Sequence, residues 1–463
     1  MKKTKQMLKK KSTNALSFEK FHLILWYSII KILKMKNFVT KIIKSSKNIT
    51  PFAGISYINS EFNNCGLSQL IDKELGNRVS TAGYNYSDII RNWANLFICG
   101  GDCAEDVQVH LRGTLEKIPG NKLSSADTLL RGNKELAVEN TQVVSSSGKT
   151  YRFNINEKMN NLNMKSLLQT GQLVKGMSYD LDFDNQIIRH NKYDASVTYK
   201  KDTGYFPGVA SIGENIIYVE NRDGNANVKM GQAETLQRVG KSLSEHDIYI
   251  YRSRMDAGSY TKDIIDAASQ ISELFYIRAN KCHSLTERIN QIDDWQKVEI
   301  NFKEYQVASL DFTQFFQERG YRLVVMRELR EDGKLDLFDG KYIYRCILTN
   351  DWENTEEDII LYYNDRGSSE DIFDVMNNDF GWKHLPCSDI HHNTVYLIIT
   401  AMIKNFYNYI VKKVSEVFTD IPSTSRLKRF IFRFINVCGQ WIYRSRQWIL
   451  KLYTDRPYEK VFC

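Results

Sequence analysis

The order of apolar patterns after Met177 most constrains the fold of this chain. Three strand-like runs come first, SYDLDFDN, QIIRHN and GVASIGENIIYVE, and a helical pattern follows in GQAETLQRVGKSL. A strand ending in DIYIYRSRMD, a helix in TKDIIDAASQI and a strand in LFYIRAN come next. This succession of three strands, helix, strand, helix and strand predicts an α/β fold.

The flanking regions have different patterns. Residues 46–170 are predicted to be mainly helical, because SQLIDKEL, YSDIIRNWANLFICGG and CAEDVQVHLRGTL have apolar residues three to four apart. A β-rich stretch follows between about residues 284 and 350, with KVEINF, RLVVMREL and YIYRCILTND as its strands. Helical patterns return near Glu370 and in TVYLIITAMIKNFYNYIVKKV. A length of 463 residues with 42% apolar residues excludes global disorder.

Positive charge is concentrated at the two ends of the chain. Residues 1–50 contain thirteen lysines and one acid, a net +12, so the rest of the chain sums to 8 − 12 = −4. The apolar run FHLILWYSIIKIL in this arm is too short to span a bilayer, and it predicts an amphipathic basic helix or an upstream translational extension. Basic and aromatic residues alternate again near the C-terminus, in TSRLKRFIFRFINVCGQWIYRSRQWILKLY. This pattern predicts a helix whose arginines could bind a polyanion, and the alternative is a packing helix with a solvated basic face.

The eight cysteines show no paired C-x-x-C spacing, which predicts a reduced, cytoplasmic setting without structural zinc. Cys387 lies upstream of His391 and His392, a set that could suggest a metal site. No second pair at ligand spacing accompanies it, so buried or incidental thiols are the favoured interpretation.

Acidic residues stand at points where this fold would bring them together. Asp180, Asp182 and Asp184 alternate along one predicted strand and therefore project to one face. Asp256 follows the strand IYIYR, at the end where open α/β sheets bind ligands. Taken separately, the aspartate run would be interpreted as a solvated strand edge and Asp256 as a turn or cap residue. Together with Glu370 they indicate a metal-lined cleft.

The stretch YYNDRGSSEDIF places Tyr363, Arg366 and Glu370 at offsets of three and seven. On a continuous helix these residues share one face with Asn377, and such a face could hold a metal ion and a phosphate. The alternative is that Ser368 caps a helix, which leaves Glu370 as a carboxylate in a first helical turn.

These segments resemble the three catalytic blocks of bacterial insertion-sequence transposases of the DDE type, in the group with the signature Tyr-x2-Arg-x3-Glu-x6-Lys. The blocks are LDFDNQ, RSRMDAGSY and YNDRGSSE, in that order. Similarity extends from about Ile49 to Tyr453 through ITPFAGISYI, ICGGDCAED, SSADTLLRG, YKKDTGYFPGVASIG, NRDGNAN, YIYRCILTND and LPCSDIHHNTVYLIITAMIKNFYNYI. A single motif would be weak, but three blocks with these flanks are specific.

The resemblance implies catalytic roles for Asp184, Asp256 and Glu370, with Asp182 as a further metal ligand. It departs from the family at two points, because Gln186 replaces a Thr and Asn377 stands where the family has a DNA-contacting Lys. The DNA-binding residues it implies are Tyr363, Arg366 and Asn377, to which SSADTLLRG adds possible phosphate contacts from Ser125, Thr128 and Arg131 near a helix start.

The implied fold is an RNase H-like catalytic core with a β-rich insertion, flanked by N-terminal and C-terminal helical segments. The expected regions are a basic arm (1–45), a helical DNA-binding region (46–170) and the first part of the core (175–283). The insertion (284–352), the second part of the core (353–418) and a basic helical tail (419–463) follow.

The implied reaction is cleavage of DNA at inverted-repeat ends by metal-assisted hydrolysis, followed by joining of the 3′ ends to target DNA. Carboxylates suit Mg²⁺ or Mn²⁺, two of which, about 3.5–4 Å apart, would serve one site. The expected partners are double-stranded DNA and a second copy of the chain, in the cytoplasm of a bacterium at its nucleoid, with no membrane. The alternatives are a nuclease of the same fold without strand transfer and a non-catalytic DNA-binding relative.

Overall fold

The computed structural model describes residues 48–78, 83–145, 147–280, 283–313, 320–330 and 341–461, together with Trp26. Residues 49–463 form one compact unit. The basic arm predicted over residues 1–45 lies outside the described residues, apart from Trp26. No helix in the described part of the chain is long and apolar enough to cross a membrane.

The strand predicted around the aspartate run is confirmed as β4 (Ser178–Asn185), inside an eleven-stranded sheet. Two antiparallel strands, β8 (Gly208–Ile212) and β9 (Asn215–Arg222), continue the sheet on one side of β4. GVASIGENIIYVE is therefore a hairpin, and the prediction of a single strand there was wrong. The turn includes Gly213 at a φ of 55°, a conformation that glycine adopts without steric cost.

The run QIIRHN contributes little to this sheet. Only β5 (Ile188–Arg189) forms there, and it belongs to a separate three-stranded sheet with β7 (Thr203–Tyr205) and β6 (Ser196–Val197). The three strands expected at the start of the domain are thus present, but the second and third come from the hairpin β8–β9.

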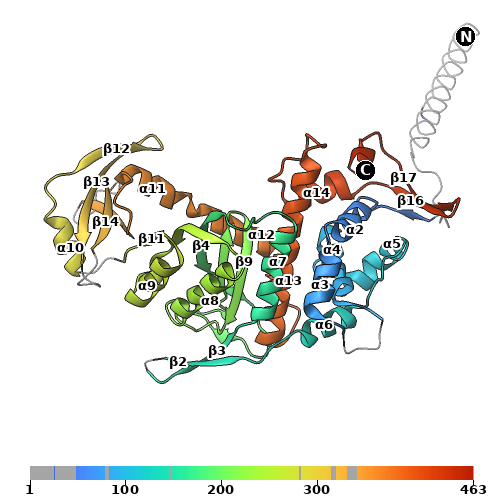
Figure 1. The fold of residues 1–463 in the computed structure, drawn as a ribbon, viewed down its shortest axis with the longest axis horizontal. Helices are drawn as coiled ribbons and strands as arrows, with labels where there is room; N and C mark the ends of the chain where they lie inside the picture. Colours follow the sequence, from blue (N-terminus) through green and yellow to red (C-terminus); the bar gives the residue numbers. More distant parts are fainter. Residues whose placement is uncertain are drawn as a thin grey trace, which may run out of the picture. The chain divides into compact units, whose positions relative to one another are not determined.

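On the other side of β4 the predicted order of helix, strand, helix and strand is confirmed by α8 (Gln232–Ser244), β10 (Tyr249–Met255), α9 (Lys262–Ile271) and β11 (Leu274–Arg278). Strand β10 pairs parallel with β4, and β11 pairs parallel with β10. Figure 1 shows α8 and α9 beside these strands, and their apolar residues complete the core on that face. The carboxyl ends of β4 and β10 consequently meet at one edge of the sheet.

The β-rich insertion extends the same sheet, because β15 pairs antiparallel with β11. It begins with α10 (His283–Asn290) and contains four strands where three were predicted. The unpredicted strand is β13, which follows β12 through a tight turn with positive φ angles at Asn301 and Phe302, as hairpins of the I′ type require. The four strands are β12 (Gln296–Ile300), β13 (Lys303–Phe312), β14 (Tyr321–Leu329) and β15 (Tyr342–Thr349).

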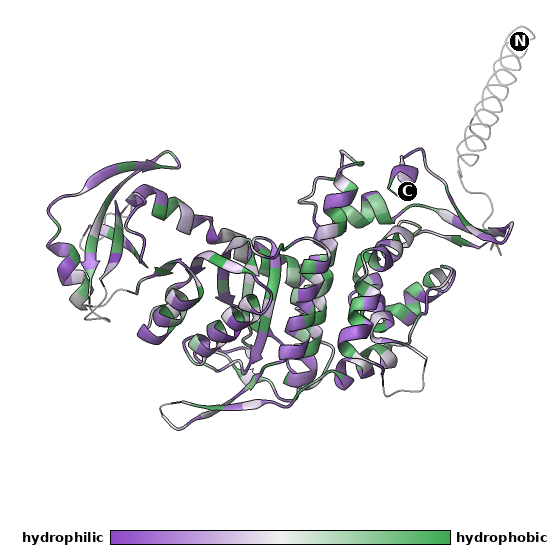
Figure 2. Cartoon of the chain, in the orientation of Figure 1, coloured by the Kyte–Doolittle hydropathy of each residue, from purple (hydrophilic) through white to green (hydrophobic). Residues whose placement is uncertain are grey.

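Helix α13 (Ile390–Ser415) joins the sheet to the N-terminal helices, since it contacts β9 on one side and α4, α6 and α7 on others. Most of its residues are buried, among them apolar residues coloured green in Figure 2. Asn405 of α13 exchanges hydrogen bonds with both backbone groups of Ile216 in β9, at 3.0 and 2.7 Å. These bonds fix the helix against the strand.

In the predicted helical region 46–170, the described residues from Ile55 to Glu135 are mainly helical, as expected. A hairpin of β2 (Thr141–Val144) and β3 (Thr150–Asn154) then pairs with β9 and extends the large sheet. The helices of this region are α2 (Ile55–Asn64), α3 (Leu67–Leu75), α4 (Tyr86–Ile98), the π-helix η1 (Val107–Leu111), α5 (Arg112–Leu115), α6 (Ala126–Glu135) and α7 (Glu157–Gln169).

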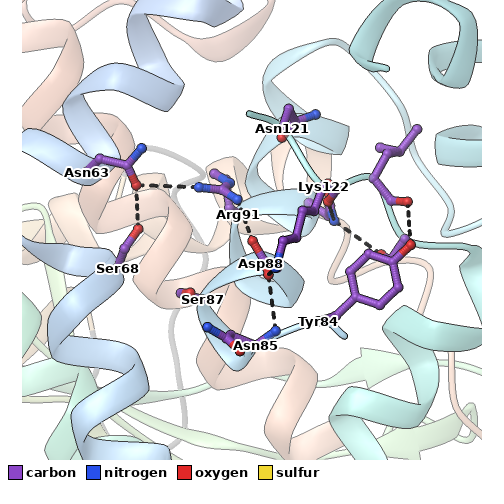
Figure 3. A network of polar contacts seen from close by, with 12 residues as sticks. Asn63, Ser68, Tyr84, Asn85, Ser87, Asp88, Arg91, Asn121 and Lys122 are labelled. Atoms are coloured by element: carbon purple, nitrogen blue, oxygen red, sulfur yellow. Dashed lines mark hydrogen bonds and ion pairs between the residues drawn. The ribbon is translucent and has the colours of Figure 1, made fainter. Parts of the chain in front are cut away.

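A polar network around the buried residues Asp88 and Arg91 connects the first three of these helices (Figure 3). Asp88, in the first turn of α4, accepts hydrogen bonds from the backbone of Asn85 at 3.1 Å and from Arg91 at 2.5 Å. Arg91 also donates to Asn63 at the end of α2, and Ser68 of α3 donates to the same oxygen. Because buried charges are costly unless paired, this arrangement favours one packing of the three helices.

The C-terminal segment was predicted to be helical, and this prediction holds only as far as Ile435. After α14 (Leu427–Phe430) and the π-helix η4 (Ile431–Ile435), the chain forms a hairpin of β16 (Gly439–Arg444) and β17 (Gln447–Leu452). The prediction was wrong for the hairpin because IYRSRQWIL alternates apolar and basic residues around a two-residue turn. That turn, Ser445 and Arg446, has the two positive φ angles of a I′ hairpin. Strand β16 also pairs with β1 (Ile49–Thr50).

Candidate active site

Two Arg–Asp pairs lie in successive positions along β4 and β10. The register places Arg252 opposite Asp180 and Arg254 opposite Asp182. Arg252 donates to both oxygens of Asp180, at 3.0 and 2.6 Å, and Arg254 donates to both oxygens of Asp182, at 2.7 Å each. Residues two apart on a strand face the same side, so these pairs share one face of the sheet.

The next position on this face holds two carboxylates instead of a pair of opposite charges. Phe183 pairs with Met255, so Asp184 and Asp256 come next, at the carboxyl ends of their strands. Burial raises the pKa of Asp184, and the charge of Asp256 raises it further, while Arg366 lowers it. Like charges on neighbouring strands destabilise a sheet unless something compensates them. A divalent cation with oxygen ligands would do so, and the donor set therefore fits Mg²⁺ or Mn²⁺.

Both carboxylates are oriented by local hydrogen bonds. Asp184 accepts from the backbone N–H of Asn185 at 2.8 Å and from Nη1 of Arg366 at 3.0 Å. Asp256 is the N-cap of the 3₁₀ turn η2 (Ala257–Ser259), where its Oδ1 accepts from the N–H of Gly258 at 2.9 Å. The aspartates are thus fixed in place by the ends of their strands.

Asp182, expected as a further metal ligand, has a different environment. Its side chain is 3% exposed, and both of its oxygens bind Arg254. Burial alone would lower the pKa of Arg254, but the hydrogen bonds and charge of Asp182 raise it. The centre of the Tyr362 ring lies 3.9 Å from the Arg252 guanidinium and 4.7 Å from that of Arg254, so one ring packs against both pairs. Both carboxylate oxygens of Asp182 are therefore occupied by the ion pair with Arg254.

Tyr363, Arg366, Glu370 and Asn377 do not share one continuous α-helix, and Glu370 stands in the first turn of a new helix, as in the alternative interpretation. Helix α11 (Glu356–Asn364) ends before a 3₁₀ turn, η3 (Asp365–Gly367), and α12 (Ser368–Asp379) begins after it. Because the two turn types differ in residues per turn, the offsets of three and seven no longer define one stripe.

Tyr363 and Arg366 both face the strands that bear the aspartates. The Tyr363 hydroxyl donates to the carbonyl oxygen of Met255 at 3.0 Å and is buried, a placement that differs from the phosphate contact expected of it. Arg254 donates to the carbonyl oxygen of Tyr362 at 2.8 Å. These two bonds tie the end of α11 to β10 immediately before Asp256, and Arg366 then reaches Asp184.

Glu370 lies in the first turn of α12, and its side chain is exposed. Helix α12 contacts β4, but within the described residues Asp184, Asp256 and Glu370 do not all approach within 4.8 Å of one another. Arg426 holds the other end of α12 through Asp374 and Asp379, at 2.7 and 2.8 Å. Asn377 is half-buried two turns beyond Glu370. The structure therefore brings two of the three expected catalytic residues together.

The residues proposed from SSADTLLRG lie at the start of α6. Ser125 is its N-cap and accepts from the N–H of Thr128 at 3.3 Å, and the two hydroxyls are 2.9 Å apart. Helix capping accounts for both side chains. Arg131 is exposed one turn later.

Among the described residues, the group that does lie within 4.8 Å is Asp389, His391 and His392, at the start of α13. Cys387 is not part of the group and is buried, in agreement with the favoured interpretation of a buried or incidental thiol. Burial raises the pKa of this thiol to about 11, as expected for a buried structural cysteine.

Comparison with known proteins identifies the family of the chain. The family model described as transposase DDE domain group 1 matches residues 39–463. No curated protein is significantly similar to the chain. Among solved structures, the chain is similar to the piggyBac transposase in a cryo-EM synaptic complex with hairpin DNA, with 11% identity, 84% of this chain and 82% of that chain covered, and a TM-score of 0.42. Because the family model spans most of its length, the chain belongs to the transposase DDE domain group 1 family.

Proposed function

We propose that this protein is the transposase of an insertion sequence, which binds the inverted-repeat ends of its own element, cleaves the DNA phosphodiester by metal-assisted hydrolysis and joins the 3′ ends to target DNA. The observation that supports it most is the pair Asp184 and Asp256. Two salt bridges precede this pair on the same strands, so β4 and β10 pair Asp180 and Asp182 with arginines and leave these two carboxylates side by side.

The strand order supports an RNase H-like core. Across the sheet the order is β9, β8, β4, β10 and β11, with β8 and β9 antiparallel to their neighbours and β10 and β11 parallel to β4. The insertion separates this core from the helix that bears Glu370, as the resemblance implies. Residues 175–283 and 353–418 are proposed as its two parts.

Asp184 and Asp256 would hold the divalent cations, Mg²⁺ or Mn²⁺, with Glu370 as the third carboxylate and two ions per site. When bound, such ions stabilise the charge that develops on the attacking and leaving oxygens. Asp182 is omitted from this set because both of its oxygens bind Arg254. Glu370 must approach the aspartates, and the turn η3 between α11 and α12 is the place where the backbone can adjust.

Arg366 has two roles in this proposal. It neutralises Asp184 in the structure described here, and its planar guanidinium can instead bind two oxygens of a DNA phosphate. Transfer of Arg366 from Asp184 to a phosphate would leave that carboxylate free for a cation. Tyr363 acts differently from the expectation, since its bond to Met255 positions the strand end that bears Asp256.

We expect Arg366→Gln to bind Mn²⁺ about tenfold more tightly than the wild type in the absence of DNA, because a charged hydrogen bond that competes with the cation is removed. Cleavage of DNA ends should fall in the same variant. Calorimetric titration with Mn²⁺ measures the affinity, and Arg252→Gln is the matched control because it removes a similar pair from Asp180. Equal Mn²⁺ affinities in all three proteins would contradict the role given to Arg366.

Recognition of the DNA ends must use other residues, because carboxylates and metal ions do not read bases. The helices of residues 46–170 are the proposed end-binding region, with the network of Figure 3 holding them in one arrangement. Arg131 is an exposed cation on α6 that could contact a phosphate. The basic arm, the basic tail and Asn377 are proposed as further contacts with the DNA backbone.

We expect Arg131→Ala to weaken binding of DNA ends and to reduce the slope of log affinity against log salt concentration by about one, as loss of one phosphate contact predicts. Gel-shift titrations across a salt series measure both. Ser125→Ala is the control, since it removes a helix cap worth about 1 kcal/mol of stability and should leave the salt slope unchanged. An unchanged slope in Arg131→Ala would remove Arg131 from the interface.

The test of the proposed function is a pair of assays on the same preparation. Cleavage of a duplex from the inverted repeat should require Mg²⁺ or Mn²⁺, and pre-cleaved ends should be joined to a target plasmid. Cleavage without joining would identify a nuclease of the same fold, and binding without either reaction would identify a non-catalytic relative. Because two ends must be cut, a dimer is the proposed active form, and crosslinking on paired ends tests it.

A further inference from the structure

A cavity of about 400 Å³ borders α12, the helix that bears Glu370. Asp371 and Ile372, which directly follow Glu370, form part of its wall. Another part comes from α13, with Lys404, and the rest comes mainly from residues 423–427, which lead into α14. The residues that line this cavity have no role in the reaction proposed above.

The side chain of Lys404 is buried in this wall without a counter-charge. Lys404 is 3% exposed, and its ammonium donates to the backbone carbonyl oxygen of Glu214, in the turn between β8 and β9. No carboxylate of the described residues forms a salt bridge with this ammonium. Burial lowers the pKa of Lys404 to about 8, although the charge of Glu214 opposes the shift. Because an ammonium has three donors and a buried charge is costly unless paired, Lys404 is suited to bind an anion in the cavity.

A buried hydroxyl group in the same wall also lacks a partner. Ser425 is 5% exposed, and its Oγ forms no hydrogen bond with the described residues. Buried polar atoms are normally paired. The backbone of Ser425 is fixed, since its carbonyl oxygen accepts a hydrogen bond from the Tyr407 hydroxyl at 2.5 Å. An ammonium and a hydroxyl that line one cavity can donate to the two oxygens of one carboxylate.

The acidic residues of the wall do not form a pair with Lys404. Asp379 accepts a hydrogen bond from Arg426 at 2.8 Å, and Glu214 and Asp371 are exposed, where water and salt screen their charges. A ligand with two negative charges would meet these acids with one buried cation to offset them, so a single negative charge is favoured. The wall also includes the apolar side chains of Ile372, Val375 and Leu427.

We propose that this cavity binds a small organic monocarboxylate, whose oxygens accept hydrogen bonds from Lys404 and Ser425. The apolar part of the ligand packs against Ile372, Val375 and Leu427. The volume of the cavity lies within the range of about 300–1,000 Å³ that small-ligand sites occupy.

A ligand in this cavity also holds α12 in the position described above. If the start of α12 moves to bring Glu370 to the aspartates, Asp371 and Ile372 move with it and the wall changes. The ligand therefore binds the present arrangement more tightly and opposes the movement, since a ligand shifts an equilibrium by its difference in affinity for the two states. Binding of the carboxylate is independent of the proposed function, and its effect on Glu370 rests on that function.

The test of binding uses the full-length protein without divalent metal, with butanoate and benzoate as probes and their uncharged amides as controls. Calorimetric titration should give a Kd below about 1 mM for at least one of the two carboxylates, and its amide should bind at least about tenfold more weakly. Lys404→Met should weaken binding of that carboxylate by about tenfold or more, and Ser425→Ala by about two- to tenfold.

Both variants should fold, because Lys404→Met replaces a buried charge by an apolar side chain of similar length and Ser425→Ala removes an atom without a hydrogen bond. Lys412→Met is the matched control, since Lys412 is an exposed lysine of the same helix and does not line this cavity. It should bind the carboxylate as the wild type does.

The effect on α12 is measured by the rate of DNA-end cleavage in Mg²⁺ at a saturating concentration of the same carboxylate. The rate should fall by about fivefold or more in the wild type and in Lys412→Met, and by less than about twofold in Lys404→Met. Absence of carboxylate binding, or equal binding by Lys404→Met and the wild type, would overturn the cavity proposal and leave the proposed function standing. Binding without a change in the cleavage rate would overturn the effect on Glu370. A wild-type protein that neither binds nor cuts the inverted repeat would instead overturn the proposed function, and the titrations would still decide whether the cavity binds a carboxylate.

Discussion

Asp256→Asn should lower the rate of DNA-end cleavage in Mg²⁺ by about a thousandfold or more, while binding of the ends changes by less than about twofold. The first effect is large because a metal ligand contributes several kcal/mol to transition-state stabilisation, and each 1.4 kcal/mol is about a tenfold change in rate. The second is small because the carboxylate makes no base contact. Asparagine keeps the acceptor that caps the turn η2, so the strand end should retain its structure.

Cleavage and gel-shift assays on one preparation measure both quantities. Asp180→Asn is the matched control, since Asp180 lies on the same face of β4 but is paired with Arg252 and one-third exposed. We expect that control to cleave at close to the wild-type rate, and Asp184→Asn and Glu370→Gln to behave like Asp256→Asn. Robust cleavage by any one of these last three variants would remove that residue from the active site.

Arg254→Met should destabilise the protein by about 3–5 kcal/mol, the cost of leaving one partner of a buried ion pair uncompensated. Both side chains are nearly inaccessible, 6% exposed for Arg254 and 3% for Asp182. The substitution also removes the donor to the carbonyl oxygen of Tyr362, which helps to tie α11 to β10. The free energy of unfolding from urea titration, together with loss of secondary structure, measures the effect.

Two further variants distinguish the loss of stability caused by the broken ion pair from that caused by general disruption of the sheet. Arg252→Met removes the neighbouring pair, which is one-third exposed on both sides, and should cost only about 0–1 kcal/mol. The double variant Arg254→Met with Asp182→Leu removes both buried charges and should recover much of the lost stability. If the double variant were as unstable as Arg254→Met, the unpaired carboxylate would not be the cause.

The sequence predicted the parts of this protein that depend on local patterns. The period-two alternation in SYDLDFDN predicted β4 to the residue, and the periodic runs of α8 and α9 predicted those helices. A signal in RSRMD was missed. Arg252 and Arg254 alternate with the same period as Asp180 and Asp182, and opposite charges in that spacing indicate two neighbouring strands that face each other.

The errors concern features that local patterns do not determine. Two turns of the same type, at Asn301–Phe302 and Ser445–Arg446, lack the glycine that usually marks a I′ hairpin, so β13 and the hairpin β16–β17 were not predicted. The offsets of Tyr363, Arg366 and Glu370 gave no sign of the 3₁₀ turn at residues 365–367. Asp182 pairs with Arg254, which is 72 residues away in the sequence, and this pairing follows only from the register of the sheet.

The pairing of β1 with β16 has a consequence for the way the protein is made. Ile49 and Thr50 pair with Gln440 and Gly439, and Ala53 and Gly54 donate to the carbonyl oxygens of Val437 and Ile435. A ribosome that adds about 5–20 residues per second needs about 20–80 s to reach the partner of Ile49, because 440 − 49 = 391 residues separate them. The N-terminal edge of the fold therefore stays open during synthesis until residue 440 has been added. Nascent chains and C-terminally truncated products lack this closure, and they should be digested by proteases from both ends.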